Sequence, residues 1–266
     1  MDLGLEGRVA LVTGAGSGIG AAIARAFCTE KVRTIFTDIN EEGLKRALKG
    51  YDAYGSYMVC DVSKRDRVKQ LFYEIRKRYK ALHILVNSAA VNTAAWVQDL
   101  MEDDIDRVIH VNIKGYIYTT MEAVVLMKDA GFGRLIYINS SSGLKASAGL
   151  SLYSASKYFD RGFAVSTALE VGEHNITSNS ICPSDVYPEG EIEARSWRNP
   201  SLVNISLMKE GAEDLEDLVN KRRAKNPMRR SCSTDDIAWL ALFLASERAG
   251  FINGQSIGIN GGSVPY

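Results

Sequence analysis

Short runs of apolar residues alternate along this chain with longer segments in which apolar residues recur every three or four positions. The short runs are rich in β-branched residues and predict strands at 8–13, 34–38, 84–87, 135–139, 177–182 and 254–259. The helical spacing predicts helices at about 20–30, 68–79, 100–128, 153–171 and 235–246. Apolar strands that alternate with helices are typical of an α/β fold, in which a doubly wound, mostly parallel sheet forms the middle of three layers.

The alternation continues through residues 1–266 without a linker-like segment or a repeat, so we predict a single domain. The exception is the segment at about 187–226, which is polar, charged and poor in strand signals. Such a segment is either a solvated helical excursion or a lid over a pocket. Because long insertions in α/β enzymes often cover active sites, we expect a substrate lid.

Charge and hydropathy exclude several classes of partner. Lysine plus arginine equal aspartate plus glutamate at 32 each, and a net charge of zero gives no support to nucleic-acid or membrane-surface binding. The first residues are acidic and lack the basic and then apolar pattern of a signal peptide. No apolar run approaches the roughly 18 residues that a membrane span needs.

Four cysteines are scattered along the chain and form no C-x-x-C motif: Cys28, Cys60, Cys182 and Cys232. This usage favours buried free thiols in a reducing compartment. We therefore expect a cytoplasmic protein without a metal site.

A glycine-rich turn follows the first predicted strand and opens the first predicted helix. It reads Thr13-Gly14-Ala15-Gly16-Ser17-Gly18-Ile19-Gly20. Glycines let the backbone turn tightly and approach a pyrophosphate, and the helix N-terminus offers free N–H groups. The second predicted strand ends in Asp38, which completes the context of a dinucleotide site. A carboxylate accepts hydrogen bonds from ribose hydroxyls and repels a 2′-phosphate, so we predict NAD(H) rather than NADP(H).

The candidate chemistry lies in Tyr153-Ser-Ala-Ser-Lys157, with Ser140 thirteen residues upstream. A free phenol has a pKa near 10 and exchanges protons poorly at neutral pH, whereas a nearby ammonium favours the phenolate. Four residues span about one helical turn, so Tyr153 and Lys157 can project from one face. A serine hydroxyl beside them can bind a substrate oxygen. This arrangement is suited to moving a proton on or off an alcohol.

With these residues the chain resembles the short-chain dehydrogenase/reductase family, from Gly7 to Gly262. The resemblance implies one Rossmann-type sheet with strand order 3-2-1-4-5-6-7. It rests on motifs in the family's order: Thr13-Gly14-x-x-x-Gly18-x-Gly20, Asp61-Val62, Asn87-Ser88-Ala89-Ala90, Asn112, Ser140, Tyr153 with Lys157, Pro183-Ser184-Asp185-Val186, Ile252-Asn253-Gly254-Gln255 and Asn260-Gly261-Gly262.

The resemblance implies hydride transfer between NAD(H) and a secondary alcohol or ketone, with Tyr153 as general acid or base. Family spacing selects Ser140 among three consecutive serines, and the implied catalytic set is Asn112, Ser140, Tyr153 and Lys157. The implied cofactor-binding set is Gly14, Ser17, Gly18, Ile19, Gly20, Asp38, Asp61, Val62, Asn87, Ala89, Tyr153, Lys157, Pro183 and Val186. The candidate substrate contacts are Ser140, Ser142, Tyr153, Trp96 and Tyr187.

Two alternative functions fit the sequence pattern less well. An enoyl reductase of the same broad family would space its tyrosine and lysine further apart. A non-catalytic NAD-binding scaffold or sensor would have no need of all four implied catalytic residues. Family members are commonly tetramers, so we expect a homotetramer or homodimer that takes a small-molecule substrate.

Four positions depart from the family pattern. Ser88 and Ala90 replace an asparagine and a glycine, Ser184 replaces a glycine, and Pro188 stands where a threonine commonly contacts the carboxamide. Each lies near the expected nicotinamide, so these departures bear on cofactor pose. None of them removes a predicted catalytic group.

Overall fold

The computed structural model describes residues 2–187 and 199–265, and within them seven parallel strands form one sheet. The strand order is β3-β2-β1-β4-β5-β6-β7, which confirms the predicted order. The strands are β1 (Val9–Thr13), β2 (Arg33–Asp38), β3 (Gly55–Val59), β4 (Ile84–Asn87), β5 (Gly133–Ile138), β6 (Ile176–Pro183) and β7 (Ser256–Ile259). All six neighbouring pairs are parallel, as βαβ connections require.

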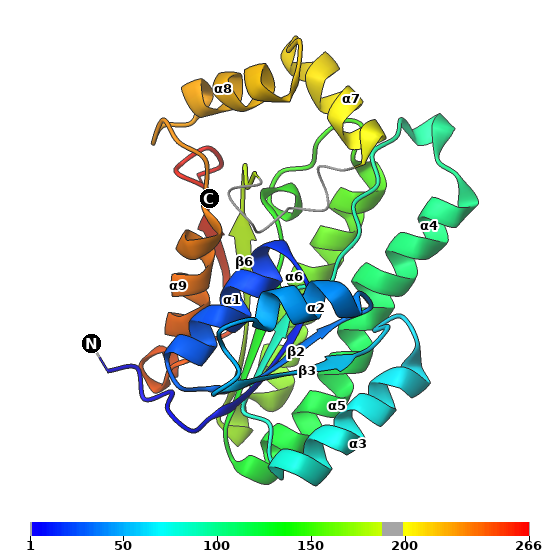
Figure 1. Ribbon diagram of the computed structural model, residues 1–266. Coiled ribbons are helices and arrows are strands. Elements are labelled where there is room, and N and C mark those ends of the chain that lie inside the picture. The colour runs from blue at the N-terminus through cyan, green and yellow to red at the C-terminus, as the bar shows by residue number, and fades with distance from the viewer. Residues whose placement is uncertain (1, 188–198, 266) are drawn as a thin grey trace.

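Helices cover both faces of the sheet (Figure 1). They are α1 (Gly18–Thr29), α2 (Glu41–Leu48), α3 (Arg65–Tyr79), α4 (Glu102–Val108), α5 (Gly115–Ala130), α6 (Ser151–Val171), α7 (Pro200–Glu210), α8 (Leu215–Lys225) and α9 (Thr234–Ala245). One apolar cluster joins the sheet to α1, α2 and α9, and a second joins it to α3, α5 and α6. The inner strands are buried on both faces, which explains why they are continuously apolar.

The helix predicted over 100–128 is interrupted. A π-helical turn at Ile109–Lys114 separates α4 from α5, and the side chain of Asn112 is buried in this turn. A π-turn inserts one residue into the helical ladder and leaves the apolar spacing on either side nearly unchanged. The periodicity of the sequence therefore did not reveal it.

The sequence pattern did not predict strand β3 at the edge of the sheet or helix α2 before it. Strand β3 is only half-buried and begins with Gly55 and Ser56, so it lacks the continuous apolar run of an inner strand. Helix α2 is short and charged on its exposed side. The polar segment beyond residue 198 forms helices α7 and α8, which extend past the carboxyl ends of the strands (Figure 1).

All four cysteines are free thiols, as their scattered positions predicted, and burial raises the pKa of the Cys28, Cys60 and Cys182 thiols to about 11. Cys232 is only partly buried. Among the described residues no helix has both the length and the hydrophobicity of a membrane span, and there is no cluster of three potential metal-ligating side chains.

Candidate active site

A cavity of about 720 Å³ opens at the carboxyl ends of the strands. Its walls come from the loops that follow β1, β2, β3, β4, β5 and β6, together with residues 199–201 at the start of α7. In open α/β sheets, ligands bind in the crevice outside the carboxyl ends of the strands. The cavity is therefore the candidate active site.

The glycine loop after β1 requires glycine at particular positions. Gly14 and Gly18 have φ of 67° and 53°, and a Cβ on Gly14 would lie 2.8 Å from the backbone of Ala89. A Cβ on Gly20 would overlap the carbonyl oxygen of Gly14. Side chains are thus excluded where the backbone meets the N-terminus of α1, whose N-cap residue Ser17 leaves the first N–H groups uncapped by a side chain. These residues fit a pyrophosphate.

Asp38 lies at the end of β2 and faces the same cavity. Its carboxylate accepts hydrogen bonds from the backbone N–H of Gly16 at 3.2 Å and of Asn40 at 2.9 Å. A Cβ on Gly16 would lie 3.0 Å from this carboxylate. The glycine loop and β2 therefore hold a negative charge where the sequence predicted a ribose contact.

The neighbouring predicted cofactor residues divide into two groups. Asp61, Val62 and Ala89 line the cavity, as do Ser17, Ile19 and Val186. Asn87 lies behind the wall, where its amide accepts from Thr119 at 2.7 Å and donates to Thr120 at 3.2 Å. Pro183 ends β6 and is likewise absent from the wall. Asn87 therefore joins the end of β4 to α5, whereas the first group of residues faces the cavity.

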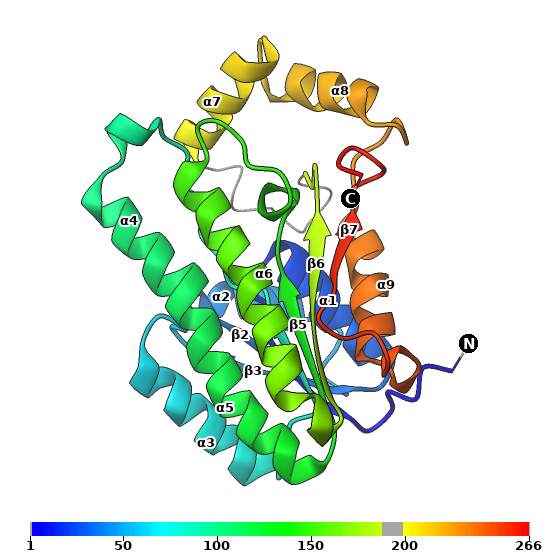
Figure 2. The same ribbon diagram turned by 180° about the vertical axis from the view of Figure 1, so that it is seen from behind.

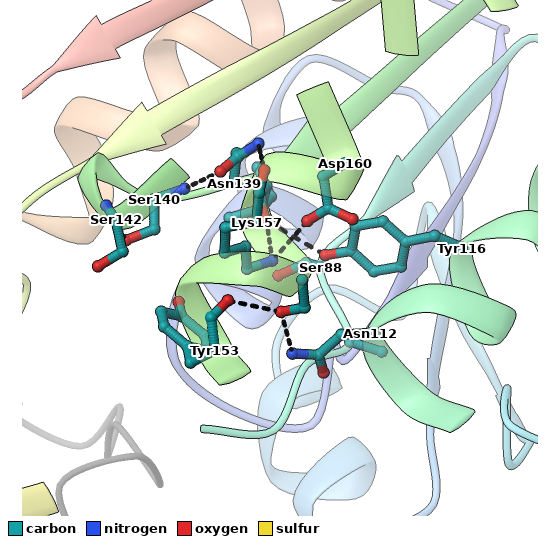
Figure 3. Close-up of polar contacts among 12 residues, drawn as sticks. Ser88, Asn112, Tyr116, Asn139, Ser140, Ser142, Tyr153, Lys157 and Asp160 are labelled. Atoms are coloured by element: carbon teal, nitrogen blue, oxygen red, sulfur yellow. Dashed lines mark hydrogen bonds and ion pairs between the residues drawn. The ribbon is translucent and has the colours of Figure 1, made fainter. Parts of the chain in front are cut away.

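Helix α6 brings Tyr153 and Lys157 into the cavity wall, as the four-residue spacing predicted. The Lys157 side chain is 1% exposed, and its ammonium donates to the carbonyl of Ile138 at 3.0 Å. The ammonium lies 5.9 Å from the centre of the Tyr153 ring. Figure 3 shows the two side chains close together.

Ser140 and Ser142 follow β5, which ends at Ile138 and does not continue through them. Residues Ser141–Gly143 form a 3₁₀ turn, and the Ser140 hydroxyl oxygen accepts from the Ser142 backbone N–H at 3.0 Å. Neither serine lines the cavity, although Asn139 beside them does. Their proposed contact with substrate stays a prediction.

The side chain of Asn112 joins the loop after β4 to α6 and is not part of the cavity wall. Its amide accepts from the Val91 N–H at 2.8 Å and donates to the Val91 carbonyl at 2.9 Å. It also donates to the Ser156 hydroxyl at 3.1 Å, one residue before Lys157. Asn112 therefore fixes the loop after β4 against α6, and any role in proton transfer stays a prediction.

The predicted substrate contacts differ in position. Tyr187 is buried and lines the cavity, whereas Trp96 is 38% exposed and lies outside its wall. Burial raises the pKa of Tyr187 to about 12, although Arg222 of α8, which donates to the Tyr187 hydroxyl at 3.3 Å, opposes this shift. Asn199 donates to the carbonyl of Asn92 at 3.0 Å. The 199–225 segment is thus bonded to the cavity wall, and its role as a lid stays a prediction.

The departures from the family pattern fit the backbone. Ser184 is accommodated at a negative φ, and the next residue, Asp185, adopts the left-handed conformation at a φ of 52°. Ala90 is exposed at the cavity wall and Ser88 beside it is half-buried there, and neither has a positive φ. Pro188 lies outside the described residues.

Sequence reasoning missed a buried carboxylate next to the predicted lysine. Asp160 is 0% exposed, and its oxygen lies 2.9 Å from the Lys157 ammonium. Tyr116 of α5 covers the same ammonium at 5.1 Å from its ring centre. The signal for Asp160 was its spacing of three residues from Lys157, because such residues share a helix face; nothing in the sequence pointed to Tyr116.

Burial and charge act in opposite directions on this pair. Burial alone lowers the pKa of Lys157, but attraction to Asp160 and to the phenols of Tyr116 and Tyr153 outweighs burial, so the pKa of Lys157 lies above its usual value. Burial raises the pKa of Asp160 to about 6 against the attraction of Lys157. Both groups are therefore charged at pH 7 and above.

The chain matches known proteins over nearly its whole length. Residues 8–199 match the family model described as short chain dehydrogenase, and residues 199–263 match one described as Enoyl-(Acyl carrier protein) reductase. The chain is 31% identical to D-beta-hydroxybutyrate dehydrogenase of Cupriavidus necator, over 98% of this chain and 99% of the relative. It is 32% identical to D-threitol dehydrogenase of Mycolicibacterium smegmatis, over 98% and 94%.

A solved structure has a closely similar fold over nearly the whole chain. The crystal structure of NAD⁺-bound xylitol dehydrogenase superposes with a TM-score of 0.88 at 25% identity, covering 96% of this chain and 98% of that one. The resemblance inferred from the motifs is thereby confirmed for both the family and the fold.

The clamp made by Asn112 can be tested by its removal. Asn112→Ala leaves the N–H and carbonyl of Val91 without their partners, and we expect a loss of about 2 kcal/mol in the free energy of unfolding. Urea denaturation measures this loss. Asn92→Ala is the matched control in the same loop, because the Asn92 side-chain oxygen has no partner among the described residues. Equal stability of Asn112→Ala and the unmodified protein would contradict the clamp.

Proposed function

The chain belongs to the short-chain dehydrogenase family and is an oxidoreductase, and on that premise we propose that it transfers a hydride between NAD(H) and a secondary alcohol or ketone. The observation that carries this proposal is that Tyr153 and Lys157 line the same cavity as the glycine loop and Asp38. A proton-handling pair and a pyrophosphate cradle are the two parts that alcohol oxidation by a nicotinamide requires.

In the oxidative direction, the chain's own residues handle the proton. Tyr153 removes the proton of the substrate hydroxyl as general base, a role that contributes roughly 10²–10⁴-fold to the rate. Lys157 favours the phenolate of Tyr153 by its charge. The bound nicotinamide supplies the hydride acceptor. Because the Ser140 oxygen already accepts from the Ser142 N–H, its own O–H is oriented away from that bond and can donate to the substrate oxygen.

Asn112 acts in this proposal through the loop that it holds. Its bonds to Val91 and Ser156 connect the cavity wall after β4 with the helix that carries Tyr153 and Lys157. A proton taken up by Tyr153 must then reach solvent, and we propose that Lys157 gives one of its protons to a water held near Asn112 and takes up the proton of Tyr153 in its place. Misplacement of these loops by about 1 Å is enough to slow such a reaction strongly.

We propose a small hydroxylated substrate. The relatives that act on D-β-hydroxybutyrate, D-threitol and xylitol each take a compact molecule with a secondary hydroxyl. The 720 Å³ cavity must also hold a dinucleotide, which limits the remaining space. Two buried oxygens in the wall, Asn92 Oδ1 and Thr93 Oγ1, have no hydrogen-bond partner among the described residues and offer sites for a further hydroxyl.

We further propose a cytoplasmic homotetramer or homodimer. Apolar side chains are exposed along α5 and α6, which lie side by side on one surface (Figure 2): Met121, Val125, Val165 and Leu169. A face of two adjacent helices with exposed apolar residues favours association with a second copy. Sedimentation velocity at micromolar concentration should return a dimer or tetramer, and a monomer mass would contradict this proposal.

The role of Tyr153 is tested by removing its hydroxyl. Tyr153→Phe should lower kcat for oxidation of a secondary alcohol by roughly 10²–10⁴-fold while NAD binding is retained, because only the proton acceptor is lost. Turnover of a panel of secondary alcohols, followed by NADH absorbance, measures it. Tyr158→Phe is the control on the same helix, since the Tyr158 hydroxyl bonds to the Leu144 carbonyl. NAD binding without turnover of any alcohol by the unmodified protein would favour the scaffold or sensor function instead.

Cofactor preference is tested at Asp38. The unmodified protein should prefer NAD over NADP in kcat/KM, because the carboxylate repels a 2′-phosphate. Asp38→Asn removes the charge and should reduce that preference by about tenfold or more. A tenfold change in the ratio of kcat/KM values corresponds to about 1.4 kcal/mol. Asp104→Asn removes a charge elsewhere on the cavity wall and should leave the preference unchanged. A preference of the unmodified protein for NADP would overturn the prediction.

A further inference from the structure

The carboxylate of the buried ion pair beside the predicted base, Asp160, has no part in the mechanism above. Asp160 lies about one turn after Lys157 on α6, and the side chains are 0% and 1% exposed. The Asp160 carboxylate oxygen Oδ2 lies 2.9 Å from the Lys157 ammonium. Figure 3 shows Lys157 between Asp160 and Tyr153, with Tyr116 beside the ammonium.

Asp160 changes what Lys157 can offer to the site. An ammonium has three N–H donors, and here one goes to Asp160 and another to the Ile138 carbonyl at 3.0 Å. At most one donor is left for a cofactor ribose. The carboxylate also opposes the positive charge through which Lys157 favours the phenolate of Tyr153.

We propose that Asp160 is a positioning residue that acts through Lys157: it holds the ammonium at the end of β5 and partly cancels its charge, so that Tyr153 loses its proton at a higher pH than Lys157 alone would impose. The inference rests on the proposed function, in which Tyr153 is the base.

The ionisation states of the pair agree with this role. Burial raises the pKa of Asp160 to about 6, so the carboxylate is charged above neutral pH. The pKa of Lys157 lies above its usual value despite burial, because Asp160 and two phenols attract its charge. The negative charge of Asp160 therefore continues to oppose the positive charge of Lys157 while Tyr153 changes its protonation state.

Asp160 has a structural effect as well as an electrostatic one. Its carboxylate compensates for the buried ammonium of Lys157, and removing one partner of a buried ion pair leaves an uncompensated charge, so Asp160→Asn is also expected to be less stable. Asp160 Oδ1 is buried and has no hydrogen-bond partner among the described residues. Lys157 lines the ligand cavity, which makes its electrostatic environment matter to chemistry.

Other titratable groups also face the pair and bear on its pH dependence. They come from α5, β5, β6 and α6 itself: Tyr116, Tyr137, Cys182, Tyr153 and, next to Cys182, Arg161. Burial raises the pKa of Cys182 to about 11 and that of Tyr137 to about 12, and it also raises the pKa of Tyr116. All three are therefore neutral below about pH 10, where the effect of Asp160 is to be measured.

Asp160→Asn tests the proposal because it keeps the shape and an acceptor oxygen for Lys157 while it removes the charge. The midpoint of the pH profile of kcat/KM for oxidation should move to lower pH by about one unit. Below that midpoint kcat/KM should rise about tenfold, with the alkaline plateau little changed. Glu170→Gln removes an exposed charge on the same helix and should leave the midpoint in place.

A second readout needs no turnover. NMR of protein isotopically labelled at tyrosine Cζ follows phenol ionisation, and Tyr153→Phe assigns the Tyr153 signal by its loss. The Tyr153 signal should titrate about one pH unit lower in Asp160→Asn than in the unmodified protein. If no alcohol is turned over but this shift is seen, the proposed function fails while the role of Asp160 stands.

The outcomes that overturn the proposal are equally definite. An unchanged titration of Tyr153 in folded Asp160→Asn, with or without a loss of thermal stability, would show that Asp160 is only structural. A shift to higher pH would show that Lys157 loses its own proton once it is unpaired. If Asp160→Asn does not fold, Asp160→Ser removes the same charge with less volume, and the same shift is expected in it.

Discussion

Seven parallel strands point in one direction, so their carboxyl ends and the loops that follow them emerge along one edge of the sheet. Everything chemical in this protein depends on that constraint. The glycine loop follows β1, Asp38 ends β2, and Ile138 ends β5 against Lys157. Residues more than a hundred positions apart thus face one cavity. The helices on both faces make the arrangement stable by burying the apolar strands, which frees the edge for polar groups.

Buried polar side chains then fix the loops at this edge. The Thr13 hydroxyl accepts from the N–H groups of Ser88 and Ala89, and so ties β1 to the loop after β4. Asn112 ties that loop to α6. Asn139 ties the end of β5 to the Lys157 carbonyl at 2.9 Å. Each bond satisfies a backbone group that would otherwise be buried without a partner, so the position of the cavity wall and the stability of the fold have the same cause.

The buried charge of Lys157 is the costliest feature of the site, and its surroundings are arranged to compensate for it. A carbonyl, a carboxylate and an aromatic ring surround the ammonium. In the proposed mechanism Lys157 favours the phenolate of Tyr153 by its charge, so a carboxylate that stabilises the lysine would also weaken that effect. The proposed role of Asp160 follows from this conflict between burial and function.

Local sequence determined the inner strands, most helices, the glycine loop and the Tyr153–Lys157 pair. Apolar runs, glycines and a spacing of one helical turn are consequences of backbone geometry that neighbouring residues already express. Strand β4 was predicted at its observed bounds. Tertiary structure alone decided the π-turn around Asn112, the 3₁₀ turn that moves Ser140 and Ser142 off the strand pattern, and the burial of Asp160. These features depend on which residues from distant parts of the chain pack against each position. A carboxylate three residues from a lysine gives the same sequence pattern whether the pair is exposed to solvent or buried in the core.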